Sequence, residues 1–304
     1  MMVIDRRMFL SLAAAATTAP AFALDDAPLG RIETLGKFGP DDLAEPRIRV
    51  WLPPGYAESG RSYRTLYMLD RQFVFAGDSE GMNFAADRRV GRLMAAGSIE
   101  PTLIVAIDNL GNDRFLQYMP QTIYDRAESG VRAVIEREIH RVGKTSLVSA
   151  QFIRFLETQL KPFIDAHYRT APDRLDTAIF GASMAGVMSG AIFVEAQKTF
   201  GRGACMSPNW AIYDKRFIDH PQLPSVWSAY FAQLGKPEGR RLWLDHGTKM
   251  MDAGMVPYQS AIAESLTDLG WRRDRNLQAR VYQAGHAFAQ TATQMDEVLT
   301  WLFA

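Results

Sequence analysis

The chain has 304 residues, of which 47% are hydrophobic and 22% are charged, a composition that suits one large α/β domain. Lysine plus arginine and aspartate plus glutamate number 34 each, so the chain lacks the basic excess of nucleic-acid-binding modules, and we expect no nucleic-acid partner. After the N-terminus no apolar run reaches about 18 residues, so we expect no membrane-spanning segment in the mature chain.

Residues 1–23 are predicted to be a signal peptide. Arg6 and Arg7 are followed by Phe-Leu, by a weakly apolar Ala/Thr stretch, and by the small-x-small cleavage site at 21–23. The R-R-x-F-L pattern is similar to a twin-arginine signal, which exports folded proteins. We therefore expect 24–304 to be the mature domain, periplasmic or secreted. The alternatives are a general secretory signal or an uncleaved basic tail.

Along the mature chain, apolar β-rich runs alternate with longer segments of helical period. The predicted strands are 47–52, 65–69, 102–107, 176–180, 203–207, 241–245 and 279–283. The predicted helices are 83–96, 147–166, 184–198, 256–269 and 289–302. Nearly continuous apolar strands are typical of a parallel sheet buried on both faces, so this alternation predicts a doubly wound α/β domain.

Two segments depart from the alternation. Pro53-Pro54-Gly55 follows the first predicted strand and leaves no room for a helix, which predicts an antiparallel start to the mostly parallel sheet. Residues 121–147 are polar and charged, and we expect a surface helix or lid there. Cys205 is the only cysteine, so an intramolecular disulfide is impossible. Histidines are not clustered at metal-ligand spacing, and we expect neither a metal nor an organic cofactor.

The stretch FGASMAGVMSG, residues 180–190, places Ser183 in a sharp turn between a predicted strand and a helix. This is the layout of a nucleophile elbow, which lifts a serine hydroxyl above the carboxyl edge of the sheet. Ala185 stands where the G-x-S-x-G pattern has its second glycine, and it adds one methyl to the strand–helix contact. We predict that Ser183 is a nucleophile; the alternative is a strand–helix turn of small residues without catalysis.

A nucleophilic serine needs a base, and enzymes with such an elbow supply it late in the chain, in the order serine, acid, histidine. His286 directly follows the last predicted strand, in the glycine-preceded loop YQAGHAFAQ, and we predict that it is the base. The remaining histidines lie in charged or irregular segments or at a strand end where packing is the better interpretation: His140, His167, His220 and His246.

Eight segments between about residues 46 and 303 match motifs of one family in the family's order: VWLPPGY, YRTLYMLD, PTLIVAIDN, FIRFLETQLKPFIDAHYRT, FGASMAG, MSPNW, LDHGT with MDAGMVPYQ, and AGHAF. Together they resemble the putative-esterase family of the α/β hydrolases, which includes enterochelin esterases, feruloyl and acetyl-xylan esterases, esterase D and the mycolyltransferases. The resemblance is weakest across 121–147. It implies an α/β-hydrolase fold and carboxylic-ester hydrolysis.

The resemblance also implies an oxyanion hole made of backbone N–H groups, one from Met184 and one from the Arg71-Gln72 turn. The sequence departs from the family at three places. Arg71 replaces the glycine of Asp-Gly-Gln, Gln117 replaces the glutamate of Arg-x-x-Glu-Tyr-x-Pro, and Ala185 replaces a glycine of the elbow. These departures concern the substrate pocket more than the nucleophile.

Arg114, Tyr118 and Trp210 lie near predicted strand ends and are candidates for the substrate pocket. For the two aromatic residues, core packing is an equal alternative. A cationic cleft would favour a ferric siderophore ester as substrate, and Arg71 and Arg114 point weakly in that direction. The other substrate class is an acyl group on a plant polysaccharide.

Two aspartates in the segment LWLDHGTKMMDAGM are candidates for the acid, and both precede His286 in the expected order. Asp245 falls within an apolar strand run, whereas Asp252 lies in the loop beyond the strand's carboxyl end, where such a fold places catalytic groups. The family's G-T-x-x-x-D-A pattern agrees, so we predict that Asp252 orients His286. The sequence thus predicts a Ser-His-Asp esterase with an acyl-enzyme intermediate. The alternatives are an acyltransferase on the same scaffold and an inactive module that binds a carbohydrate or a partner protein.

Overall fold

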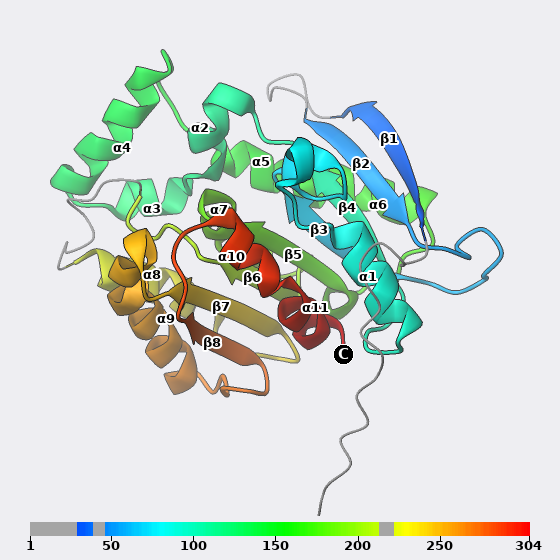
Figure 1. The fold of residues 1–304 in the computed structure, drawn as a ribbon. Helices are drawn as coiled ribbons and strands as arrows, with labels where there is room; N and C mark the ends of the chain where they lie inside the picture. Colours follow the sequence, from blue (N-terminus) through cyan, green and yellow to red (C-terminus); the bar gives the residue numbers. More distant parts are fainter. Residues whose placement is uncertain (1–28, 39–45, 213–221) are drawn as a thin grey trace, which may run out of the picture.

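The computed structural model describes residues 29–38, 46–212 and 222–304 (Figure 1). Its centre is an eight-stranded sheet in the order β1-β2-β4-β3-β5-β6-β7-β8. β2 pairs antiparallel with both β1 and β4, and the other neighbours are parallel. The strands are β1 Arg31–Lys37, β2 Arg47–Leu52, β3 Arg64–Leu69, β4 Thr102–Ile107, β5 Thr177–Ala182, β6 Arg202–Met206, β7 Arg241–Gly247 and β8 Leu277–Tyr282.

The helices lie between and after these strands. They are α1 Ala86–Ala95, α2 Arg114–Tyr118, α3 Gln121–Arg126, α4 Ser129–Arg141, α5 Ser149–Phe155, α6 Lys161–His167, α7 Met184–Glu195, α8 Leu223–Phe231, α9 Val256–Asp268, α10 Phe288–Thr293 and α11 Met295–Phe303. A π-helical turn, Leu156–Leu160, joins α5 to α6. Among the helices described, none is both long and apolar enough to cross a bilayer.

Different helices cover the two faces of the sheet (Figure 1). Along β3, Leu66 and Met68 point to one face, where they pack with residues of α1 and α11. Tyr67 and Leu69 point to the opposite face, where α5, α7 and α9 contribute to the core. Burial of alternate residues on two faces explains why central strands such as β3 and β4 are apolar almost throughout. The predicted α/β-hydrolase architecture is confirmed.

The predicted strands all form, and the antiparallel start is confirmed, but β1, α2 and α8 are not among the predicted elements. The helix predicted over 147–166 is α5 and α6 joined by the π-helical turn, and the helix predicted over 289–302 is α10 and α11. The charged segment 121–147 forms α3 and α4, and α4 buries one stripe of apolar residues while its other side is exposed. The predicted signal peptide lies outside the described residues.

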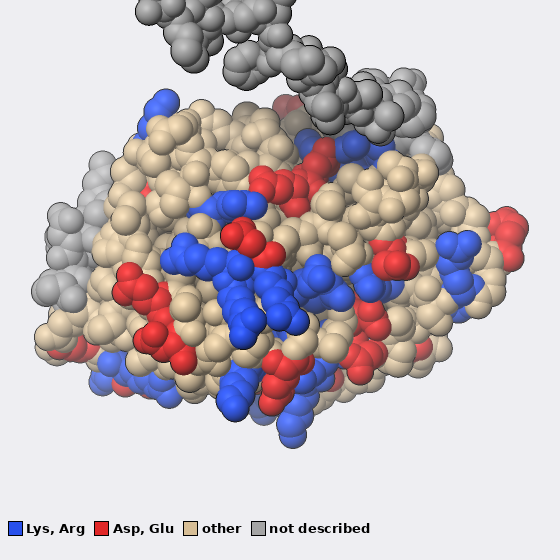
Figure 2. All heavy atoms as spheres, turned by 90° about the horizontal axis from the view of Figure 1, so that it is seen from below, with Lys and Arg blue, Asp and Glu red and all other residues tan. Residues whose placement is uncertain are grey.

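Arginines at the amino ends of three parallel strands hold the end of α11. Arg64 and Arg241 donate hydrogen bonds to the carbonyl oxygens of Phe303 (2.6 Å) and Trp301 (2.8 Å), and Arg202 donates to that of Leu302. Burial, together with the neighbouring guanidinium groups, lowers the pKa of Arg202 to about 10. Figure 2 shows Lys and Arg side chains gathered on one face of the molecule. Arg64, Arg202 and Arg241 satisfy the last carbonyl oxygens of α11, and the carboxyl end of a helix favours positive charge.

Candidate active site

Ser183 occupies the turn between β5 and α7. Its backbone angles, φ 58° and ψ −124°, are rare for a residue with a side chain and are those of a strained turn. A Cβ at Gly181 would lie 2.0 Å from the carbonyl oxygen of Ala185, so that position requires glycine. Ala185 is itself buried in the core. The turn therefore accommodates the methyl group of Ala185, which stands where the G-x-S-x-G pattern has its second glycine.

Three residues far apart in sequence meet at this turn. His286, in the loop after β8, places Nε2 2.9 Å from Ser183 Oγ. On the other side of the ring, His286 Nδ1 lies 2.6 Å from Asp252 Oδ1. Asp252 belongs to the 3₁₀ turn Met250–Met255 that follows β7. The structure thus brings Ser183, His286 and Asp252 into one continuous chain of hydrogen bonds at the carboxyl ends of β5, β7 and β8.

The carboxylate of Asp252 is buried, with 1% of its side chain exposed. Its second oxygen, Oδ2, accepts hydrogen bonds from Ser207 Oγ (2.8 Å) and from the Gly247 N–H (2.9 Å). Burial by itself raises the pKa of Asp252, but the hydrogen bonds from His286, Ser207 and Gly247 outweigh it, so the pKa lies below its ordinary value. Asp252 is therefore an anion facing the imidazole.

Asp245, the other candidate acid, is fully buried near the end of β7. Its Oδ1 accepts the Ser207 N–H (2.8 Å), and its Oδ2 accepts Trp243 Nε1–H (2.6 Å). Burial raises its pKa to about 7, against the lowering effect of these two hydrogen bonds and with a further rise from the charge of Asp252. Among the described hydrogen bonds, His286 Nδ1 is paired with the carboxylate of Asp252 and not with that of Asp245.

The raised pKa of Asp245 predicts a pH dependence of stability. The unfolded chain loses this proton near its ordinary pKa of 3.8, whereas the folded protein keeps it until about pH 7. Because the folded state binds more protons in this window, stability falls as the pH rises through it. Asp245→Asn removes this term. From pH 5 to pH 8, the free energy of unfolding should therefore fall by about 3 kcal/mol more in the wild type than in the Asp245→Asn variant.

Urea denaturation of the wild type and of Asp245→Asn at both pH values measures this difference. The titration of Asp252 does not contribute to this difference, because the pKa of Asp252 is lowered and lies below this pH range. Parallel pH dependences in the two proteins would show that Asp245 titrates at its ordinary value.

An ion-paired network holds the turn that follows β3. Asp70 adopts a left-handed conformation (φ 59°) and precedes the 3₁₀ turn Arg71–Phe73. Arg114 binds the Asp70 carboxylate through two hydrogen bonds, of 3.0 and 2.6 Å, and Asn109 donates a third of 2.7 Å. Tyr118 Oη accepts the Asp70 N–H at 3.3 Å. The bidentate pair fixes the start of the turn whose N–H groups are candidates for the oxyanion hole.

The three candidate pocket residues are either buried or ion-paired. Tyr118 and Trp210 have no exposed surface, so neither lines an open cavity in this structure, and core packing fits them better. Trp210 packs against Trp227, with ring centroids 4.7 Å apart. Arg71 pairs with Asp108 (3.1 Å), and Arg114 pairs with Asp70. Both guanidinium groups that hinted at a cationic cleft are thus matched by carboxylates.

Sequence reasoning missed Ser207, which bridges the two aspartates. It follows β6 in the segment MSPNW, and position beyond a parallel strand is the signal that could have marked it. Gln117, which replaces the family's glutamate, is buried, and its Oε1 accepts the Leu110 N–H (2.9 Å). A glutamate could accept the same hydrogen bond. Among the described residues, no three His, Cys, Asp or Glu side chains could hold a metal ion together.

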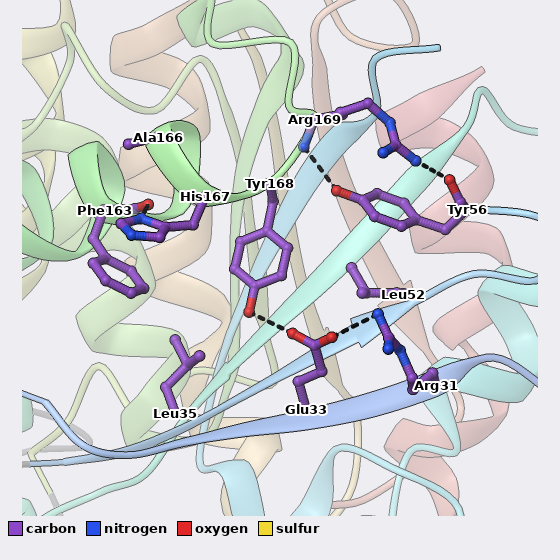
Figure 3. A pocket seen from close by; sticks show the side chains of 10 residues that line it. All are labelled: Arg31, Glu33, Leu35, Leu52, Tyr56, Phe163, Ala166, His167, Tyr168 and Arg169. Carbon is purple, nitrogen blue, oxygen red and sulfur yellow. Dashed lines mark hydrogen bonds and ion pairs between the residues drawn. The ribbon is translucent and has the colours of Figure 1, made fainter. Parts of the chain in front are cut away.

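A hollow of about 500 Å³ lies elsewhere, between β1 and the end of α6 (Figure 3). In it, Glu33 accepts a hydrogen bond from Tyr168 (2.8 Å) and pairs with Arg31 (2.7 Å). The Arg169 guanidinium lies over the ring of Tyr56, 4.0 Å from its centroid. These polar groups are matched with one another, and the triad is formed by other segments of the chain.

The chain belongs to the esterase family whose model, described as "Putative esterase", matches residues 44–301. It is accordingly a carboxylic-ester hydrolase. No curated protein sequence matches the chain.

Several solved structures share the fold. A ferulic acid esterase is 16% identical with a TM-score of 0.59, covering 90% of this chain and 98% of its own. An IroE-like serine hydrolase from Shewanella oneidensis is 17% identical with a TM-score of 0.62, covering 90% and 80%. The enterobactin esterase FES from Shigella flexneri, solved in the presence of enterobactin, is 15% identical with a TM-score of 0.64, covering 91% of this chain and 60% of its own. At such identities the likeness is one of fold.

Proposed function

We propose that the protein hydrolyses carboxylic esters through a Ser183–His286–Asp252 triad and an acyl-enzyme intermediate. The observation that carries this proposal is the continuous chain of contacts, 2.9 Å from Ser183 Oγ to His286 Nε2 and 2.6 Å from His286 Nδ1 to Asp252 Oδ1. These distances lie within the range required between nucleophile, base and orienting acid. The strained elbow supports the proposal, because such a turn presents a serine hydroxyl to substrate.

In the first half of the reaction, Ser183 Oγ attacks the ester carbonyl carbon while its proton passes to His286 Nε2. The tetrahedral intermediate collapses, the bond to the leaving alkoxide oxygen breaks, and the imidazolium donates its proton to that oxygen. In the second half, His286 takes a proton from water, whose oxygen attacks the acyl carbon. The bond from that carbon to Ser183 Oγ then breaks, the acid leaves, and the imidazolium returns its proton to Ser183 Oγ. Throughout, Asp252 accepts the Nδ1–H and stabilises the imidazolium as an ionised carboxylate.

The oxyanion of the tetrahedral intermediate is proposed to accept hydrogen bonds from the backbone N–H groups of Met184 and of the Arg71-Gln72 turn. Met184 is the first residue of α7, so its N–H has no acceptor within the helix and lies at the positive end of the helix dipole. Backbone donors are fixed before charge develops, which is why they suit this task. The Arg114–Asp70 ion pair would keep the second donor in place.

The ion pairs around the turn favour a neutral ester as substrate. A ferric siderophore ester is anionic and would be recognised by unmatched cationic groups. Arg71 and Arg114, the arginines that favoured such a substrate, are instead bound to Asp108 and Asp70. We therefore place an acyl group on a carbohydrate ahead of a siderophore ester.

A panel of esters tests this function: 4-nitrophenyl acetate and butyrate, methyl ferulate, acetylated xylo-oligosaccharides and ferric enterobactin. Turnover of the short-chain, feruloyl or acetyl-sugar esters, with a lower kcat/KM for ferric enterobactin, is the expected result. A kcat/KM that is highest for ferric enterobactin would reverse the choice of substrate class. Absence of turnover for every ester would contradict the proposed reaction.

The enzyme is further proposed to act in the periplasm as residues 24–304, after removal of a twin-arginine signal. We expect mass spectrometry of the periplasmic protein to find Leu24 at the N-terminus. Changing Arg6→Lys together with Arg7→Lys should block export, because the receptor reads the paired arginines. Unchanged export of that double variant would instead assign the segment to the general secretory route.

A further inference from the structure

We propose that Ser207 is a positioning residue of the triad, and this inference rests on the proposed function. Ser207 directly follows β6 and is buried. Its hydroxyl donates to Asp252 Oδ2 over 2.8 Å, on the side of the carboxylate opposite His286. Because an ionised carboxylate only accepts hydrogen bonds, the direction of this O–H is fixed by its partner.

The role follows from how the two oxygens of Asp252 are used. Oδ1 faces the imidazole, while Oδ2 is held by the Ser207 hydroxyl and the Gly247 N–H. These two donors prevent rotation of the carboxylate and stabilise its ionised form in a buried place. With the hydroxyl gone, Oδ2 would keep one of its two donors. Asp252 would then hold the imidazole less firmly in line with Ser183.

Ser207 is itself fixed by a second buried acid. Its N–H donates to Asp245 Oδ1 (2.8 Å), and Trp243 holds the other oxygen of Asp245. Its backbone has φ 38°, in the region that non-glycine residues rarely adopt. A strained, buried residue with both its N–H and its hydroxyl bound to carboxylates is held in one conformation by its surroundings.

The segment around Ser207 also holds the nucleophile. The carbonyl oxygen of Met206 accepts the Ser183 N–H (2.9 Å), and the Asn209 N–H donates to the Ser183 carbonyl oxygen (3.3 Å). Residues 206–209 therefore contact the backbone of the nucleophile and the side chain of the acid. Through this one segment, the two ends of the triad are fixed relative to each other.

The test compares Ser207→Gly with a matched buried serine. Glycine readily adopts φ 38°, so this variant removes the hydroxyl without adding backbone strain. Its kcat on 4-nitrophenyl butyrate should fall about 10- to 100-fold with nearly unchanged KM, the loss expected for a hydrogen bond to a charged group. In the control Ser189→Ala, the lost hydroxyl donates to the Gly186 and Ala204 carbonyl oxygens, and kcat should stay near wild type.

A double-mutant cycle separates positioning from general damage. In an Asp252→Asn background, Ser207→Gly should add little further loss, because both changes disrupt the same unit. Ser207→Cys keeps a weaker donor, so its kcat should lie between those of the wild type and Ser207→Gly. If the glycine variant does not fold, the cysteine variant takes its place in the test. Losses that multiply, or a wild-type kcat in Ser207→Gly or Ser207→Cys, would overturn the inference.

Two companion variants show which proposal has failed. If Ser183→Ala and Asp252→Asn lose activity while Ser207→Gly does not, the triad stands and Ser207 has no positioning role. If Ser183→Ala keeps activity, the triad itself is wrong.

Discussion

Ser183→Ala is expected to lower kcat for ester hydrolysis by up to about 10⁶-fold, the loss typical of removing the nucleophile of a triad. The reason is that Ser183 supplies the atom that bonds to the acyl carbon, and His286 then has no proton to accept. Steady-state kinetics on 4-nitrophenyl butyrate measures the loss. Because alanine is subject to the same backbone strain at φ 58°, the melting temperature should change little.

The matched control for this variant is again Ser189→Ala, which removes a buried hydroxyl from α7 within the same helix–strand contact. Near-wild-type turnover in the control and its loss in Ser183→Ala would tie the effect to one hydroxyl. Substantial turnover by a folded Ser183→Ala protein would contradict the proposed chemistry and require another nucleophile.

Asp252→Asn should lower kcat by up to about 10⁴-fold, whereas Asp245→Asn should cost less than about tenfold. Asp252 accepts a hydrogen bond from the Nδ1–H of His286. An asparagine at this position would either place its own N–H beside that Nδ1–H or favour the imidazole tautomer that carries the proton on Nε2. Asp245 is bonded to Ser207 and Trp243, and its effect on His286 passes through other residues. The pair tests which buried carboxylate orients the imidazole.

Kinetics of both variants at pH 8 measures the ranking, with circular dichroism as the check on folding. At that pH the wild-type Asp245 is largely ionised, because its pKa is about 7. The comparison is therefore between two carboxylates, each replaced by a neutral amide of the same shape. A larger loss for Asp245→Asn would make it the orienting acid.

The elements that could be predicted from sequence are those whose local pattern is strong. Several of the predicted strands, such as β3 and β4, are nearly continuous apolar runs because they are buried on both faces. β1 was not found because it is an edge strand, RIETLGK, in which exposed Ile32 and half-buried Leu35 are three positions apart and give no alternating pattern. α8 was not found because its buried residues recur at helical spacing over nine residues, too short for periodicity to distinguish helix from strand.

For the site, the candidates that could be named from sequence are those that local patterns mark, whereas contacts between distant segments could not be predicted. Ser183 lies in a turn that can be read from its neighbours, and His286 in a loop after the last strand. The partner of Ser207 is 45 residues away and that of Arg114 is 44 residues away. Neither contact leaves a pattern in the sequence, so the ion pair between Arg114 and Asp70 could not be predicted.

The most direct test of the account is to label the protein with a fluorophosphonate and map the adduct by peptide mass spectrometry. We expect a single adduct, on Ser183, because the neighbouring His286 activates this serine above the others. Labelling should be lost in Ser183→Ala and strongly slowed in His286→Ala. An adduct on a different serine, or a folded wild-type protein that hydrolyses no ester and takes up no label, would contradict the account.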